Sequence, residues 1–165
     1  MKYDFDKVVD RSGSGDLKHE VLAERYGRGD LLPLWVADMD FETPQFITDA
    51  LRGLEQIKSV NYVGLPDNPY YALAQRQFGK TAGCMFTIDL ESKEACFRFI
   101  NRLKLVRRAT NLFDNRTLAI HPASTIFGPF TDEQRAAMDV LDTTIRISVG
   151  LEDMDDIVED FRQAL

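Results

Sequence analysis

Cysteine, histidine and long apolar runs are all scarce in this sequence. Its 165 residues include two cysteines and two histidines, too few for the disulfide framework of a small secreted protein or for a zinc knuckle. The longest apolar stretch, residues 31–37, contains Pro33 and is far shorter than the roughly 20 residues that span a bilayer. Residues 1–10 are charged and carry no apolar signal region. These absences predict a cytoplasmic protein that does not enter the membrane.

Basic residues are in deficit as well. The chain has 20 lysines and arginines against 27 aspartates and glutamates, which gives a net charge of −7. Nucleic acids and anionic membranes attract proteins that present a basic face, so neither is an expected partner. The hydrophobic fraction of 44% and the charged fraction of 28% are typical of a globular domain. This balance excludes disordered, collagen-like and coiled-coil classes, and the length allows one domain with a real core.

The spacing of apolar residues predicts a mixture of helices and strands. Helices are expected over about 17–26, 43–54, 70–78, 92–103 and 153–165, with another that begins at the T-x-x-Q capping box of Thr131 and Gln134. Gly27 is expected to end the first of them, Thr43 with Pro44 to begin the second, and Ser92 to cap the helix over 92–103. Strands are expected over 60–63, 84–89, 105–109, 117–120 and 145–149, and residues 31–39 are expected to form an extended, largely buried segment. Most of these strands alternate, and an alternating strand has one solvated face. The sequence therefore predicts an α+β fold, a two-layer sandwich of an antiparallel or mixed sheet with helices on one side.

Few residues have the spacing of a catalytic or metal site. His19 and His121 are far apart and share no ligand spacing, so a structural role is favoured for both, and no metal is expected. Cys84 and Cys96 fall on inward-facing positions, where a cysteine is usually a small hydrophobe. The segment 12–16 is rich in Ser and Gly and precedes a helix. It could cradle a phosphate, although its aspartate disfavours an anion and helix capping explains the same residues.

The charged side chains in the last third of the chain have structural explanations, but Arg146 also allows a functional one. The acidic residues at 152–156 begin the last helix, where the helix dipole favours negative charge. Arg146 lies in the middle of a strand, on the face opposite the apolar side chains Ile145 and Ile147. It is either a solvated surface residue or a planar fork for a carboxylate. Asn111, in the loop after residues 109–110, is equally ambiguous when taken alone.

Two runs of sequence resemble different pyridoxal-phosphate (PLP) enzymes of fold type I. The first run resembles the N-terminus of the cystathionine β-lyase/aminotransferase group, which includes bacterial C–S lyases. It comprises residues 3–6, LLPLWVADMDF at 31–41 and Thr43-Pro44. The second run begins at about residue 54 and resembles the C-terminal domain of Cys/Met-metabolism enzymes. It includes GLP at 64–66, HPAST at 121–125 and IRISVGLED at 145–153. Within that group the residues resemble O-acetylhomoserine sulfhydrylase most, and cystathionine γ-synthase and methionine γ-lyase less.

The resemblance implies the small domain of a fold type I enzyme. We expect one domain over residues 1–165, in which an N-terminal C–S lyase-like segment, 1–53, packs against a sulfhydrylase-like domain, 54–165. In these families a large domain lies between such pieces and supplies the Schiff-base lysine and the groups that hold the cofactor. The junction near 51–57 leaves no room for that domain. Moreover, Lys58, Lys80, Lys93 and Lys104 do not follow the family's Ser-x-x-Lys pattern.

Site residues follow from the same resemblance. Arg146 matches the arginine that binds the substrate α-carboxylate, and Asn111 matches the polar residue that assists it. Phe113 stands where the sulfhydrylases usually have Gly, and Val63 stands where a Pro is usual. No catalytic residue and no cofactor are expected for this chain alone, although the family uses PLP.

Three hypotheses about function remain. The chain is a small domain of a transsulfuration enzyme without catalysis of its own, an interaction or ligand-binding module that associates with a full-length sulfhydrylase or lyase, or a working enzyme. The missing lysine context counts against the third. The face of Trp35 and Met39, where the large domain would dock, predicts a homo-oligomer or a complex with a full-length relative.

Overall fold

The structure is a computed structural model that describes residues 13, 17–33, 45–78 and 82–165. Several expectations fall outside these residues. They concern the extended segment 31–39 beyond residue 33, the face of Trp35 and Met39, and the cap of the second helix at Thr43 and Pro44. The Ser/Gly-rich segment 12–16 is also outside them, apart from Gly13.

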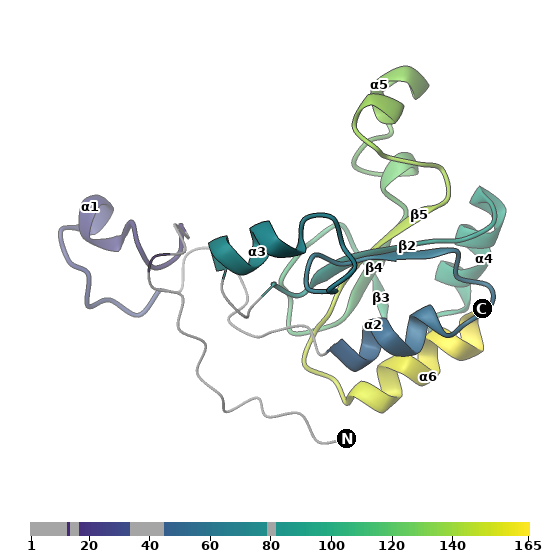
Figure 1. Cartoon of the computed structure of the whole chain (residues 1–165), viewed down its shortest axis with the longest axis horizontal. Coiled ribbons are helices and arrows are strands. Elements are labelled where there is room, and N and C mark those ends of the chain that lie inside the picture. The colour runs from purple at the N-terminus through teal and green to yellow at the C-terminus, as the bar shows by residue number, and fades with distance from the viewer. Residues whose placement is uncertain (1–12, 14–16, 34–44, 79–81) are drawn as a thin grey trace.

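In the described part of the chain, five strands form one mixed sheet. Their order across the sheet is β1 (Ser59–Asn61), β2 (Met85–Asp89), β5 (Thr144–Ser148), β4 (Leu118–Ile120) and β3 (Arg107–Arg108) (Figure 1). Neighbouring strands are antiparallel except for β3 and β4, which are parallel. The mixed sheet confirms the predicted fold class.

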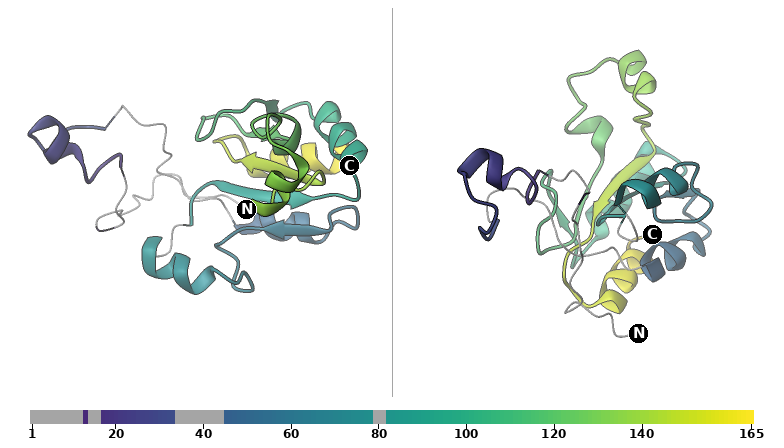
Figure 2. Two further views of the ribbon diagram at one scale, coloured as in Figure 1. Left: turned by 90° about the horizontal axis from the view of Figure 1, so that it is seen from above. Right: turned by 60° about the vertical axis from the view of Figure 1, so that its left-hand side comes forward.

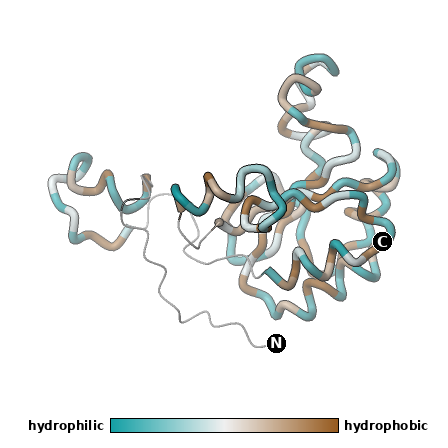
Figure 3. The backbone as a smooth tube through the Cα atoms, viewed as in Figure 1, coloured by the Kyte–Doolittle hydropathy of each residue, from teal (hydrophilic) through white to brown (hydrophobic). Residues whose placement is uncertain are grey.

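One face of the sheet is covered by α2 (Gln45–Arg52), α4 (Lys93–Arg102) and α6 (Met154–Ala164). Hydrophobic and hydrophilic residues alternate along α2 and α6, as an amphipathic helix requires (Figure 3). Phe99 and Phe161 pack with their ring centroids 5.8 Å apart. They meet Ile88, Ile145 and Ile147 of the sheet, which are completely buried. The hydrophobic core therefore lies between the sheet and this helical layer.

Helix ends agree closely with the predicted caps. Ser92 Oγ accepts a hydrogen bond from Ala95 N at 3.2 Å at the start of α4. The predicted capping box precedes α5 (Asp132–Ala137), with both reciprocal hydrogen bonds between Thr131 and Gln134. Gly27, at φ +70°, ends α1 (Leu22–Tyr26), as glycine does readily. α1 begins later than expected, because residues 17–21 form turns.

Four predicted strands are shorter in the structure, and side chains explain the difference at β3 and at β4. β3 has two residues in place of the predicted 105–109, because the Leu105 and Val106 N–H groups donate to the Asp160 carboxylate and not to a strand. β4 begins at Leu118 because the Thr117 N–H donates to Glu152. Both partners lie far along the sequence, so strand propensity does not reveal them.

The remaining elements lie outside the helical layer. α3 (Tyr71–Phe78) confirms the helix predicted over 70–78, and η1 (Pro122–Ser124) follows β4. α5 projects away from the sheet, and α1 lies apart from it (Figures 1 and 2). No helix among the described residues is long and apolar enough to cross a membrane.

α2 is joined to the sheet by a tight connection, residues 53–58. Ile47 and Leu51 of α2 are completely buried, and the helix contacts both α6 and β1. Within the connection, Ile57 N donates to Leu54 O at 3.0 Å, and Lys58 N reaches Asp89 O of β2 at 2.8 Å. The helix before the junction and the strand after it therefore share one core.

Candidate functional site

Arg146 occupies the centre of β5, on the face turned away from the helical layer. Its neighbours in the chain, Ile145 and Ile147, are completely buried in the core, whereas Arg146 is half-buried. Thr87 of β2 and Ile120 of β4 are its cross-strand partners on either side. Strand alternation thus places a guanidinium group on the second face of the sheet, as the sequence predicts.

The guanidinium group of Arg146 contacts a neighbouring loop. Its Nη2 donates to Thr110 O at 2.9 Å and to Asn111 O at 3.1 Å. Its Nε is buried and has no hydrogen-bond partner among the described residues, an arrangement that costs about 1–3 kcal/mol. No described carboxylate forms an ion pair with Arg146, and burial lowers its pKa. Arg146 is therefore a partly desolvated cation without a described counter-ion.

Asn111 lies next to Arg146, but its side chain is not the group that makes the contact. The side chain is exposed and forms no hydrogen bond with a described residue, while the main-chain oxygen accepts from Arg146. The structure therefore brings the two predicted site residues together through the backbone of one of them.

The loop that contains Thr110 and Asn111 is also hydrogen-bonded to a second side chain of β5, Ser148. Phe113 N donates to Ser148 Oγ at 3.0 Å, and Ser148 itself is buried. Phe113 has φ +55°, in the left-handed region that favours glycine. A glycine would adopt this backbone conformation without the steric strain that a Cβ atom brings. Sequence reasoning singled out Phe113 but missed Thr110 and Ser148, although alternation places Ser148 on the same strand face as Arg146.

The C-terminal end of this loop, residues 115–117, is held against residues 150–151 by hydrogen bonds and by close backbone packing. Gly150 N donates to Thr117 Oγ1 at 2.9 Å, and Leu151 N donates to Asn115 O at 3.0 Å. A Cβ atom on Gly150 would lie 2.4 Å from the main-chain carbon of Arg116. Only glycine allows the two backbones to approach so closely.

The histidines and cysteines lie in structural surroundings. His121 is buried, where Nδ1 lies 2.8 Å from Ser124 Oγ and Nε2 lies 2.8 Å from Asp142 O. His19 lies in the turns before α1. Cys84 and Cys96 are both buried, as predicted. Cys96 packs in the main hydrophobic cluster, and the sulfur of Cys84 lies 3.9 Å from Ser148 Oγ. The described residues contain no cluster of three potential metal ligands.

The lysines show whether the described residues fit PLP. A Schiff-base lysine needs a pocket that desolvates its amine beside the ring. Lys58 and Lys104 are exposed, and Lys93 forms an exposed ion pair with Asp142 at 3.5 Å. Lys18 is buried but precedes α1, which lies apart from the sheet (Figure 1). Since none of these amines is shown beside Arg146, the described residues do not fit the cofactor.

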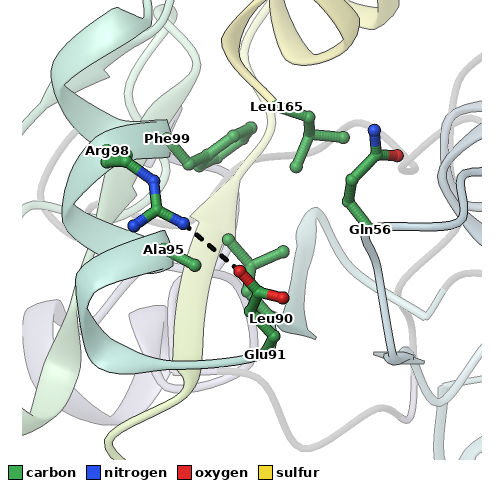
Figure 4. A pocket seen from close by; sticks show the side chains of 7 residues that line it. All are labelled: Gln56, Leu90, Glu91, Ala95, Arg98, Phe99 and Leu165. Carbon is green, nitrogen blue, oxygen red and sulfur yellow. Dashed lines mark hydrogen bonds and ion pairs between the residues drawn. The ribbon is translucent and has the colours of Figure 1, made fainter.

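A shallow pocket lies on the other side of the sheet, at the edge of the helical layer (Figure 4). Leu90, Ala95, Phe99 and Leu165 give it an apolar lining, and Arg98 pairs with Glu91 at 3.3 Å across its mouth. Both charged side chains are more than half exposed. The pocket does not include Arg146, and its charges already satisfy each other.

Comparison with known proteins gives consistent matches. Residues 38–165 match the sequence model described as Cys/Met metabolism PLP-dependent enzyme. O-acetyl-L-homoserine sulfhydrylase 1 of Thermus thermophilus is 42% identical over 67% of this chain and 26% of its own length. L-methionine gamma-lyase of Pseudomonas putida is 38% identical over 73% of this chain and 30% of its own.

A solved structure extends the match to three dimensions. The O-acetylhomoserine sulfhydrylase of Wolinella succinogenes superimposes with a TM-score of 0.63 and 41% identity, over 73% of this chain and 31% of that one. The chain thus spans less than a third of the length of these relatives.

Proposed function

This chain belongs to the Cys/Met metabolism PLP-dependent enzyme family, and we propose that it is a small-domain unit of that family that binds an amino-acid carboxylate without catalysing a reaction by itself. The proposal depends chiefly on one observation. Arg146 presents a partly desolvated guanidinium group, without a described counter-ion, on the sheet face opposite the helical layer.

The chemistry of the group fits a carboxylate. A guanidinium offers several N–H donors in one plane, and a carboxylate can accept two of them in parallel. A buried Nε without a partner raises the energy of the free state, so a ligand that pairs with it gains affinity. We assign the α-carboxylate of a sulfur amino acid, or of its O-acetylated precursor, to this position.

The absence of independent catalysis is proposed from the lysines and the junction. None of the described lysines has surroundings suited to a Schiff base beside Arg146, as set out above. In addition, residues 53–58 link α2 to β1 directly and are tied to β2 by Lys58 N and Asp89 O. No step through PLP is therefore assigned to this chain.

Ligand binding is tested by NMR titration of the full chain with L-methionine, using L-methioninamide as the probe that lacks the carboxylate. We expect chemical-shift changes near β5 with L-methionine and much weaker ones with the amide. Arg146→Lys should weaken binding at least tenfold, because an ammonium lacks the planar fork. Arg107→Ala removes one exposed cation from β3 and is the matched control. Unchanged affinity in Arg146→Lys would refute the assignment.

Absence of catalysis is tested by absorption spectroscopy. The purified chain is titrated with PLP and then reduced with borohydride. We expect no protein-specific aldimine band at saturating PLP. A band that reduction fixes to a single lysine, identified by peptide mapping, would overturn this part of the proposal.

A second candidate function is supported by exposed apolar side chains around α5. Ile126, Phe130, Met138 and Leu141 are each about 40–50% exposed on the segment that projects from the sheet (Figure 2). Such side chains favour an interaction module that associates with a full-length sulfhydrylase or lyase, or with a second copy of this chain. Co-purification with a full-length relative tests it, and Leu141→Glu should abolish the complex. Equal recovery of the complex with the unaltered chain and with Leu141→Glu would exclude this surface.

A further inference from the structure

The hydrogen bonds of Arg146 leave no complete fork for a carboxylate. Nη2 carries two hydrogens, and the structure gives it two acceptors, Thr110 O and Asn111 O. A two-point pair with a carboxylate uses Nη2 together with either Nε or Nη1. Both arrangements therefore require a hydrogen that Nη2 already donates to the loop.

Nε is closed off in the same conformation. It is buried and has no partner among the described residues, so an incoming carboxylate oxygen cannot reach it unless the surroundings move. The guanidinium can offer Nη1 alone to a ligand, which yields a single-point contact and not a fork.

We infer that the loop segment 110–113 is an internal competitor that occupies Arg146 in place of a carboxylate, and that a ligand binds in the two-point mode only when this segment is displaced. The inference rests on the proposed function, because it concerns the same carboxylate site. It adds that the site exists in a closed and an open form.

The closed form is held by few contacts. In the described part of the chain, the hydrogen bonds of segment 110–113 all reach side chains of β5: two come from Arg146 and one goes to Ser148. The segment also contains Phe113 at φ +55°, a conformation that costs a non-glycine residue energy. Thr110 and Asn111 are exposed. The segment can therefore leave β5 without disrupting the core.

Ser148 is the residue that couples the loop to the site without touching the proposed ligand. Its Oγ accepts from Phe113 N, so the loss of this hydroxyl removes one of the bonds that keep the segment closed. Only open molecules bind in the two-point mode, so the apparent ligand affinity is the intrinsic affinity multiplied by the fraction of molecules that are open. Opening the segment should therefore strengthen binding, whereas a loop that helps to build the site would have the opposite effect.

The test is an NMR titration of Ser148→Ala with L-methionine, beside the unaltered chain. The loss of one hydrogen bond predicts binding that is tighter by roughly two- to tenfold. Ser59→Ala, which removes a hydroxyl bonded to Asp89 at the edge strand β1, is the matched control and should bind as the unaltered chain does. Phe113→Pro is a second variant. It deletes the N–H and forbids a positive φ, so it should also bind more tightly.

A second measurement uses the protein without ligand. In the closed form the Nη2 hydrogens of Arg146 are protected, and their exchange with water in ¹⁵N NMR spectra should be slow. Ser148→Ala should accelerate this exchange, whereas Ser59→Ala should not.

The outcomes separate the two proposals. Binding that depends on Arg146 but is unchanged or weaker in Ser148→Ala and Phe113→Pro overturns the internal competitor and leaves the carboxylate site intact. Binding that does not depend on Arg146, or no binding in any of these variants, refutes the proposed site and the competitor with it. Unchanged Nη2 exchange in Ser148→Ala also overturns the competitor.

Discussion

Glu152 holds Thr117 through both of its carboxylate oxygens, Oε1 accepting from the backbone N–H and Oε2 from Oγ1, each at 2.8 Å. The same Thr117 Oγ1 accepts from Gly150 N at 2.9 Å. This chain of hydrogen bonds connects the end of β5 to the start of β4. These bonds thus fix the two strands at the end of the sheet where the loop that contains Thr110 and Asn111 leads into β4.

Glu152→Gln should lower the free energy of unfolding by about 1–2 kcal/mol. A neutral amide accepts through one oxygen, so one of the two charge-assisted hydrogen bonds is lost. Urea denaturation of both proteins measures the difference. Glu159→Gln, at an exposed position of α6, should change stability by less than about 0.5 kcal/mol. A loss no larger than that of the control would contradict the role of Glu152.

Gly150→Ala should destabilise the fold by about 3 kcal/mol. The new Cβ would lie 2.4 Å from the main-chain carbon of Arg116 and 2.5 Å from Thr117 N, and backbone cannot give way as a flexible side chain can. Thermal unfolding followed by circular dichroism gives the comparison. Gly29→Ala is the control, because its nearest contact would be Ala23 Cβ at an ordinary 3.7 Å. If both variants melt alike, the close approach at Gly150 is not required.

Asp160→Asn should cost about 3 kcal/mol of stability. The buried Asp160 carboxylate accepts from three successive backbone donors, Lys104 N, Leu105 N and Val106 N, at 2.9–3.0 Å. An amide presents an NH₂ group to some of these donors and leaves them unsatisfied. Chemical denaturation is the measurement, and Asp156→Asn on the exposed face of α6 is the control. Near-equal stability of the two variants would count against this account.

Cys96 should make stability fall at high pH. Burial raises the pKa of its thiol from 9.0 to about 11, and Sγ donates to Thr143 O at 3.1 Å. Because the folded pKa is the higher one, the unfolded chain loses this proton first. The contribution to stability is complete below pH ~9 and disappears as pH rises toward 11.

The measurement compares unaltered protein with Cys96→Ala at pH 8 and pH 10.5. The stability difference between the two proteins should shrink by about 2 kcal/mol at the higher pH. Comparing them removes the titration of groups that they share. A difference that stays constant over this range would show that the folded pKa is not raised.

Local patterns in the sequence predict much of this fold. Ser92, Thr131 and Gln134 cap helices through contacts within three residues, which spacing alone reveals. Alternation across Ile145 and Ile147 likewise predicts the face that Arg146 occupies. By contrast, β3 is shortened by Asp160, more than 50 positions away in the chain, and no local pattern announces such a partner.

The surroundings of Arg146 show the same limit more sharply. The sequence and the family resemblance single out Arg146 and Asn111, but they do not reveal that Asn111 contributes a main-chain oxygen. Ser148 escapes notice because a serine in a strand is unremarkable until its cross-loop partner, Phe113 N, is known. The pattern of side chains predicts which face of a strand a residue occupies. The contacts of this loop use main-chain atoms, which every residue has, so the sequence does not distinguish them.

The contact between α2 and α6 has a consequence for how the chain acquires its structure. Ile47 and Leu51 are buried against a layer that includes Ile157 and Phe161, more than 100 positions later. Contacts so distant in sequence close large loops and slow folding. During synthesis, α2 emerges from the ribosome well before α6 exists and must wait with its apolar face uncovered. We therefore expect nascent chains that stop before α6 to depend on chaperones, and the core to form only after α6 has been released.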